Sequence, residues 1–206
     1  MATLDSSVST NPVKPDGYRT TGQGRQNGFT LIELMVVIGI TVVLMTIVTG
    51  YSREGGRQLA LVGTETKMLN LFSRAKFLSV ETFFGGGRSG DQRICAYGVK
   101  VDASAEELFI FQDLSSDAKC PGTSNGAYND GERLTGELNE VKLENTVVVF
   151  GESDLSEVIF IPPDPQTKVR KTDNSEVSSA KLTVKLKEGN GQFVIIVNNV
   201  GQIKTE

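Results

Sequence analysis

Glu33 is the residue of this sequence whose position most suggests chemistry, because it is the one charged residue in the apolar stretch from Leu31 to Gly50. A carboxylate in an apolar span costs roughly 2.5–3.5 kcal/mol at mid-membrane on insertion scales and less near the end, so we expect it to have a partner. Thr30 precedes it by three residues, which is the spacing of a capping box, in which the glutamate accepts a hydrogen bond from a backbone N–H at the helix start. A carboxylate has two oxygens, so capping leaves one for a second partner.

The chain contains no histidine, so Ser-His-Asp and Cys-His nucleophile systems, histidine metal sites and imidazole proton shuttles all lack their central residue. Nothing singles out a pair among the 25 acidic residues for glycosidase-type acid–base work. We therefore expect no catalytic residue, no cofactor and no enzyme activity.

A stretch rich in oxygen donors covers residues 125–132. Asn129, Asp130 and Glu132 could supply some of the six to eight oxygens that calcium needs, but their spacing misses the D-x-D/N-x-D/N-G calcium loop. The Asn-Asp-Gly sequence also favours a plain turn. We expect the turn, and calcium binding remains the alternative.

The charge balance bears on possible partners. The formal net charge is −4, and from Glu81 onward there are 20 acidic and 13 basic residues, with one small basic tract at residues 168–171. Nucleic-acid binding normally requires a basic face that displaces counterions from phosphates. We therefore expect no nucleic-acid partner.

The element that positions Glu33 is the apolar stretch itself. Fourteen of its twenty residues are Leu, Ile, Val or Met, and twenty helical residues span about 30 Å, the thickness of a bilayer hydrocarbon core. A buried core helix is the alternative, but it would be shorter and would show a polar stripe. We expect a transmembrane helix over residues 29–50, preceded by a polar segment, residues 1–28, without apolar periodicity.

An amphipathic continuation of the helix is expected over residues 51–84. Its apolar residues recur at a spacing near 3.6 and form one face: Leu61, Met68, Leu71, Phe72, Ala75 and Leu78. Gly55, Gly56 and Gly63 each weaken a helix by about 1 kcal/mol relative to alanine, which suggests a kink or frayed section near Gly55. The glycine run that begins at Gly85 ends the helix.

The remaining residues, 85–206, are expected to form a β-rich domain. The predicted strands are residues 93–101, 108–114, 134–143, 146–150, 158–161, 181–187, 192–198 and 201–204. The strongest hairpin joins the strands at 181–187 and 192–198 across Glu188-Gly-Asn-Gly191. The fold class is therefore α+β, a long N-terminal helix packed on an antiparallel β-sheet or small β-sandwich.

The sequence Gly28-Phe29-Thr30-Leu31-Ile32-Glu33-Leu34, followed by the apolar run, resembles the class III signal of type IV pilins and type II secretion pseudopilins. The resemblance implies that a prepilin peptidase cuts after Gly28, removes residues 1–28 and methylates the new amine of Phe29. It also implies that Glu33 pairs with the Phe29 amine of a neighbouring subunit during assembly.

The resemblance also implies the topology. Lys14, Arg19 and Arg25 precede the helix and Arg53 and Arg57 follow it, so the positive-inside rule does not decide its orientation. The family places the protein in the bacterial inner membrane with a single span, a cytoplasmic N-terminus and a periplasmic C-terminal domain, before it enters a pseudopilus or pilus.

One long helix followed by consecutive strands is similar to the arrangement of GspH/FimT-type proteins. This implies a minor pseudopilin of type II secretion whose partners are the prepilin peptidase, other pseudopilins or pilins contacted through N-terminal helices, and the inner-membrane assembly platform. A minor type IV pilin is one alternative. A single-pass membrane-anchored β-domain that binds a ligand or partner without polymerising is another.

Cys95 and Cys120 both lie in the domain that this topology exports. A disulfide there would close a loop of about 25 residues and stabilise the fold by roughly 3 kcal/mol on the chain-entropy model. Two free thiols are the alternative, there is no C-x-x-C motif, and a structural zinc site would need carboxylates to complete it. We expect the disulfide.

Overall fold

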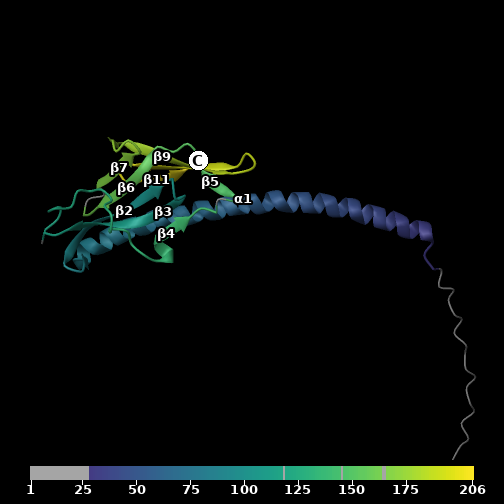
Figure 1. Ribbon diagram of the computed structural model, residues 1–206, viewed down its shortest axis with the longest axis horizontal. Coiled ribbons are helices and arrows are strands. Elements are labelled where there is room, and N and C mark those ends of the chain that lie inside the picture. Colours follow the sequence, from purple (N-terminus) through teal and green to yellow (C-terminus); the bar gives the residue numbers. More distant parts are fainter. Residues whose placement is uncertain (1–27, 118, 145, 164–165) are drawn as a thin grey trace, which may run out of the picture. The chain divides into compact units, whose positions relative to one another are not determined.

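The computed structural model describes residues 28–117, 119–144, 146–163 and 166–206, so the predicted leader lies outside the described residues except for Gly28. The chain divides into two compact units, Met1–Thr46 and Ile47–Glu206, and each is described by itself. One helix, α1 (Leu31–Gly85), begins in the first unit and continues into the second (Figure 1).

α1 is continuous over 55 residues. The glycines at 55, 56 and 63 do not interrupt it, because each costs only about 1 kcal/mol and leaves the backbone hydrogen bonds intact. Every residue from Leu31 to Gly50 is exposed, and by length and composition the helix can cross a membrane.

The later part of α1 buries the predicted amphipathic face. Leu61, Met68, Leu71, Phe72 and Ala75 are buried, and Leu78 packs beside them half-buried. The helix ends where the glycines begin, since Gly86 adopts a φ of 66° and its N–H donates to the Thr82 carbonyl at 2.9 Å.

Antiparallel strands form a first sheet, sheet A. Its order is β4-β3-β2-β6-β7-β8, with β1 beside β2. The strands are β1 (Arg88–Ser89), β2 (Gln92–Asp102), β3 (Glu107–Ser115), β4 (Glu140–Lys142), β6 (Leu155–Ile161), β7 (Gln166–Lys171) and β8 (Glu176–Val177).

A second antiparallel sheet, sheet B, has the order β11-β10-β9-β5. Its strands are β5 (Val148–Phe150), β9 (Ser179–Leu186), β10 (Gln192–Asn198) and β11 (Ile203–Thr205). β9 and β10 form the predicted hairpin, with Phe193 opposite Val184. Inward residues alternate with outward ones along both strands, so one face of sheet B is buried.

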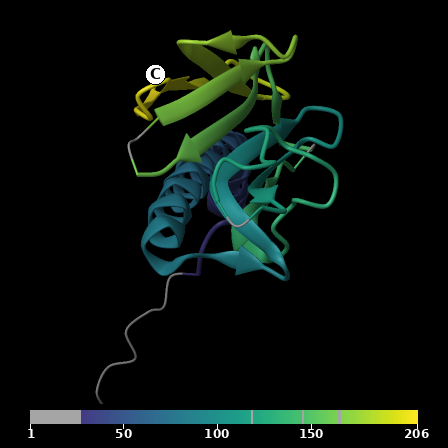
Figure 2. The ribbon, with the colours of Figure 1, turned by 90° about the vertical axis from the view of Figure 1, so that its left-hand side faces the viewer.

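One core joins α1 to both sheets. Phe72 of α1, Val99 and Ile110 of sheet A, and Leu182 and Ile195 of sheet B are all fully buried in it. Figure 2 shows sheet B on one side of α1 and the strands of sheet A beside the same helix. The predicted fold class, α+β with one long helix and antiparallel sheets, is confirmed.

The strand predicted at residues 134–143 is mostly wrong. The segment forms a short 3₁₀ turn (Glu137–Asn139) and only the three residues of β4 are extended. Gly136, with a φ of 123°, breaks the extended backbone before the turn, and Leu138 is exposed, so the apolar residues of the segment do not line one face.

β7 was not predicted as a strand, because its sequence appeared as a basic tract after a proline-rich stretch. Its residues alternate in burial, with Thr167 and Val169 inside. Lys168 and Arg170 alternate with these two residues and take the opposite face, where Arg170 donates to the Glu157 carboxylate of β6.

Candidate processing and assembly site

Gly28, Phe29 and Thr30 lie outside the helix, directly before α1, and all three are exposed. Phe29 is 87% exposed. An exposed, non-helical backbone with a glycine at one side gives a protease access to the peptide bond. Both residues of the Gly28–Phe29 bond are exposed, and cleavage at this bond stays a prediction.

Thr30 and Glu33 form a reciprocal capping box at the start of α1. The backbone N–H and the hydroxyl of Thr30 both donate to Glu33 Oε2 at 3.1 Å, and the Glu33 N–H donates to Thr30 Oγ1 at 3.3 Å. Two backbone donors that have no partner within the helix are satisfied in this way.

The capping box uses only one oxygen of the glutamate. Within the part of the chain that the structure describes, no hydrogen bond reaches Glu33 Oε1. The carboxylate is held in one orientation by Oε2, so Oε1 is available to a cation or donor from outside this chain. The arrangement suits recognition of a positive group and shows no feature of bond-breaking chemistry.

The helix that follows presents apolar side chains on all sides. Ile32, Met35, Val43 and Ile47 are each more than half exposed. An apolar surface of this extent needs a membrane or other helices around it. The capping box therefore stands at the entrance to a segment that requires a non-aqueous environment.

Cys95 of β2 and Cys120 form a disulfide, with their Cα atoms 5.4 Å apart. Cys120 belongs to the segment between β3 and the 3₁₀ turn, which we call the covering loop (residues 116–134, without 118). The loop covers a second apolar cluster on sheet A, where Tyr128 packs edge-on against Phe109 and Phe111 with ring centroids 5.2 and 5.4 Å apart. The disulfide thus ties the covering loop to β2.

The three calcium candidates are placed in this loop, but two of them serve its own hydrogen bonds. The Glu132 carboxylate accepts from the Leu114 N–H at 3.1 Å and from the Asn129 N–H at 2.7 Å. Asn129 also donates through its amide to Asn125, while Asp130 lies exposed in the turn. Within the described ranges, no three His, Cys, Asp or Glu side chains gather as a metal site.

Asp113 is a buried carboxylate that the sequence did not single out. Its Oδ2 accepts a hydrogen bond from the Gly126 N–H at 3.1 Å, and its Oδ1 is buried with no hydrogen-bond partner among the described residues. Burial and, to a smaller extent, the nearby Glu132 carboxylate together raise the pKa of Asp113 to about 6, and hydrogen bonding from Gly126, Ser124 and Asn125 opposes the rise. Both faces of β3 are covered, and Asp113 lies on the same face as Phe109 and Phe111, beneath the covering loop.

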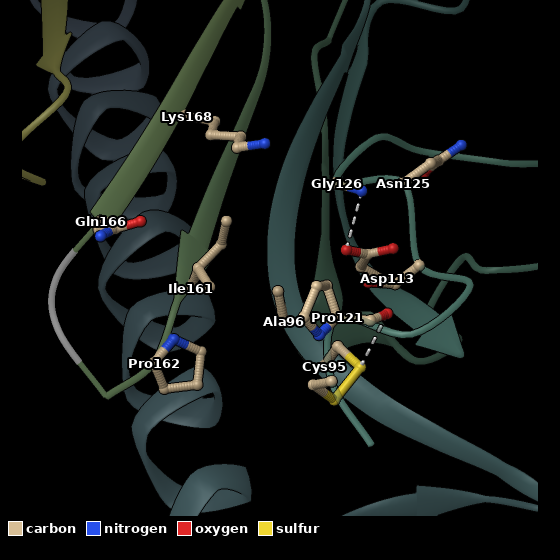
Figure 3. Close-up of a pocket in the computed structure, with 12 residues that line it drawn as sticks. Cys95, Ala96, Asp113, Pro121, Asn125, Gly126, Ile161, Pro162, Gln166 and Lys168 are labelled. Carbon is tan, nitrogen blue, oxygen red and sulfur yellow. Dashed lines mark hydrogen bonds between the residues drawn. A yellow bond between two sulfur atoms is a disulfide. The ribbon is translucent and has the colours of Figure 1, made fainter. Parts of the chain in front are cut away.

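Asp113 lines a pocket of about 470 Å³ between the covering loop and β7. Figure 3 shows Asp113 and Gly126 on one wall, with Lys168, Gln166 and Ile161 on the other. The disulfide forms one end of the pocket.

The basic tract of β7 is largely neutralised. Arg170 donates to Glu157 Oε1 at 2.7 Å, and Lys171 lies 2.9 Å from Asp154 Oδ2. Glu157 also accepts from the Tyr128 N–H at 3.3 Å, so these charges hold β6, β7 and the covering loop together. The tract therefore serves the fold.

Comparison with known proteins agrees with the site at the start of α1. Residues 23–49 match the family described as the prokaryotic N-terminal methylation motif. No curated protein matches the chain. Among solved structures the chain is similar to the minor pseudopilin EpsH from the type 2 secretion system of Vibrio cholerae, with 16% identity, a TM-score of 0.35, and coverage of 71% of this chain and 95% of that chain. The motif match includes the Gly28–Phe29 bond, the capping box and all of the apolar stretch except Gly50.

Proposed function

From the premise that this chain is a type IV pilin-like protein with a class III signal, we propose that it is a GspH/FimT-like minor pseudopilin, a structural subunit of a type II secretion pseudopilus. The observation that carries the proposal is the capping box directly after the Gly28–Phe29 bond, with Glu33 Oε1 left open at the mouth of an exposed apolar helix. The motif implies processing by a prepilin peptidase and assembly with other pilin-like proteins.

Processing sets up the assembly contact. The peptidase hydrolyses the Gly28–Phe29 bond, removes residues 1–28 and leaves the Phe29 amine as the new terminus. This amine then takes a methyl group from a sulfonium methyl donor, which leaves as a thioether, and one proton is released. A methylated amine remains a cation. Glu33 Oε1 of one subunit accepts this cation from its neighbour, and the contact neutralises two charges that are each costly in an apolar environment.

The remaining parts follow from this role. Residues 29–50 anchor the chain in the bacterial inner membrane with a single span, residues 51–84 continue the helix, and residues 85–206 form the periplasmic domain. The partners are the prepilin peptidase, other pseudopilins contacted through their N-terminal helices, and the inner-membrane assembly platform. The subunit acts mechanically and contributes no catalytic group of its own.

Mass spectrometry of the protein from membranes of a peptidase-positive cell tests the processing. The expected N-terminal peptide begins with N-methyl-Phe29. A chain that keeps Met1 in such cells would rule out the proposal.

A second experiment tests the role of Glu33. Glu33→Ala is expected to insert in the membrane and to be cleaved, but to be lost from sheared or cross-linked filaments, because the neighbour's amine then has no counter-ion. Glu81→Ala is the matched control, since Glu81 is an exposed acid on the same helix, and it should assemble normally. Normal incorporation of Glu33→Ala would remove the pairing role.

A minor type IV pilin has the same N-terminal features and is the second candidate. A deletion strain separates the two, because loss of exoprotein secretion indicates the secretion system and loss of surface pili indicates the pilus. A membrane-anchored binding domain that never polymerises is the third candidate, favoured by the pocket beside Asp113. It predicts that the chain is not recovered with pseudopili or pili from cells that express it.

A further inference from the structure

The outward face of sheet B carries a group of lysines. Lys181 and Lys185 lie on β9 and Lys204 on β11, and all three are exposed. The register places Ile196 directly opposite both Lys181 and Lys204, and places Gln192 opposite Lys185. Residues that are directly opposite share a face, so the three lysines point to the same side of the sheet.

Half-buried apolar side chains lie between these lysines. Val194 and Ile196 of β10 and Val149 of β5 occupy the same face by register, since Val149 is opposite Lys185. We call this set the lysine face: Lys181, Lys185, Lys204, Val149, Val194 and Ile196. Apolar residues in the centre with charges around them are the pattern of a protein–protein interface.

The lysine face stands out electrostatically from the domain that carries it. From Glu81 onward the chain has 20 acidic and 13 basic residues. Among the described residues, none of the three lysines takes part in a salt bridge, whereas Lys100, Arg133, Arg170 and Lys171 all do. Two acids lie close to the face: Asp154 Oδ1 accepts a hydrogen bond from the Lys181 backbone N–H at 2.6 Å, and the backbone of Glu206 pairs with that of Val194.

The opposite face of sheet B is buried against α1 in the core. Leu182, Val184 and Ile195 are buried in the core with α1, as Figure 2 shows for the position of the sheet on that helix. The lysine face is therefore the side of sheet B that remains for a partner. Its three lysines are exposed, and Val149, Val194 and Ile196 between them are half-buried.

We propose that the lysine face docks an acidic face of a neighbouring pilin-like subunit. The inference rests on the proposed assembly and adds to it a second contact, far along the chain from Glu33. The choice of partner rests on charge complementarity. A basic face on an otherwise acidic domain attracts the acidic surface of a similar domain and repels another basic face. Nucleic acid is disfavoured, because the net-negative domain repels phosphates and the face has no aromatic side chain on which bases could stack.

The test uses the full-length chain in membranes of a cell that assembles it. The photo-crosslinker p-benzoylphenylalanine replaces Gln192, an exposed residue on the same face as Lys185. After irradiation, mass spectrometry identifies the adduct and reads the N-terminus in the same sample. The expected adduct links the crosslinker at position 192 to an acidic segment of another pilin-like subunit.

Reversing the charge of two lysines then tests whether the lysines are responsible for the contact with the neighbouring subunit. Lys181→Glu with Lys185→Glu should lower the yield of adduct by about tenfold, the equivalent of 1.4 kcal/mol. The control is Lys119→Glu with Lys142→Glu, which makes the same change in net charge at two exposed lysines outside the face and should leave the yield within about twofold.

Each outcome bears on a distinct statement. Three outcomes would overturn only the proposed docking at the lysine face. They are an adduct with lipid or nucleic acid, the absence of a protein adduct in a processed and assembled chain, and equal adduct yields from the two double variants. An unprocessed N-terminus would overturn the proposed function, and with it this inference.

Discussion

Glu33 and Asp113 illustrate what single residues contribute to this protein, because each carboxylate uses only one of its two oxygens in the hydrogen bonds found among the described residues. Glu33 has one oxygen in a capping box, and no other described residue donates a hydrogen bond to its second oxygen. Asp113 accepts a hydrogen bond from the Gly126 N–H at one oxygen, and its other oxygen is buried without a hydrogen-bond partner among the described residues. The first is placed to meet a cation from another chain, whereas the second weakens the fold when it is ionised.

The effect of Asp113 on stability is expected to depend on pH. The pKa of this carboxyl is about 6 in the folded chain and 3.8 ordinarily, so the folded state binds more protons than the unfolded state between these values. The free energy of unfolding should therefore fall as pH rises from about 4 to about 6, and remain lower above that range.

Asp113→Asn should abolish this fall. At pH 8 it should raise the free energy of unfolding by on the order of 2 kcal/mol, and at pH 3.5 the difference from the original chain should nearly vanish. Chemical denaturation in detergent micelles, followed by near-ultraviolet circular dichroism, measures the effect. Asp91→Asn, at an exposed acid, is the control. Parallel curves for Asp113→Asn and the original chain would show that burial does not shift this group.

At the scale of elements, β2 depends on close approach to its neighbours. Gly98 faces Ile159 of β6 and Phe111 of β3. A Cβ added at Gly98 would stand 2.4 Å from Phe111 Cζ and 2.6 Å from the Val158 carbonyl oxygen. One of these neighbours is backbone, so the sheet cannot make room by turning a side chain.

Gly98→Ala and Gly63→Ala should therefore change the free energy of unfolding in opposite directions. Gly98→Ala is expected to lower the free energy of unfolding by about 3 kcal/mol through overpacking. Gly63→Ala lies on α1 with open space around the new Cβ and should raise it by up to about 1 kcal/mol. Thermal unfolding of both variants in the same micelles provides the measurement. A neutral Gly98→Ala would mean that β2 and β6 can move apart at this point.

At the scale of the whole molecule, α1 contributes one face to the core and leaves the other side exposed. Phe72 is fully buried, whereas Phe77, five residues further along the same helix, is 66% exposed. The buried face closes the space between the inner sides of the two sheets. The second unit, residues 47–206, therefore depends on α1 as an integral part of its core.

Phe72→Ala and Phe77→Ala test this dependence with the same chemical change. Phe72→Ala should lower the free energy of unfolding by about 3–5 kcal/mol, because it leaves a cavity at the centre of the core. Phe77→Ala should change it by less than about 0.5 kcal/mol. Hydrogen exchange of β9 and β10 should accelerate in the first variant only. Equal effects of the two variants would indicate that α1 does not hold the sheets together.

The sequence predicted the parts of this protein that depend on local pattern. The apolar stretch with Glu33, the amphipathic face from Leu61 onward and the β9–β10 hairpin all follow from periodicity and turn residues that lie close together in the chain. The removal of residues 1–28 and the methylation of Phe29 stay predictions, because they concern processing. The strand at 134–143 failed because Gly136 breaks the extended backbone.

Only the tertiary structure decided which distant groups meet. It placed Asp113 beneath Gly126 and paired Arg170 with Glu157. It also aligned Lys181, Lys185 and Lys204 on one face. These arrangements depend on strand register and on burial, which are set by contacts across the whole domain and leave no short-range trace in the sequence. The capping box and the helix depend on residues three or four positions apart, and for that reason the sequence alone determined them.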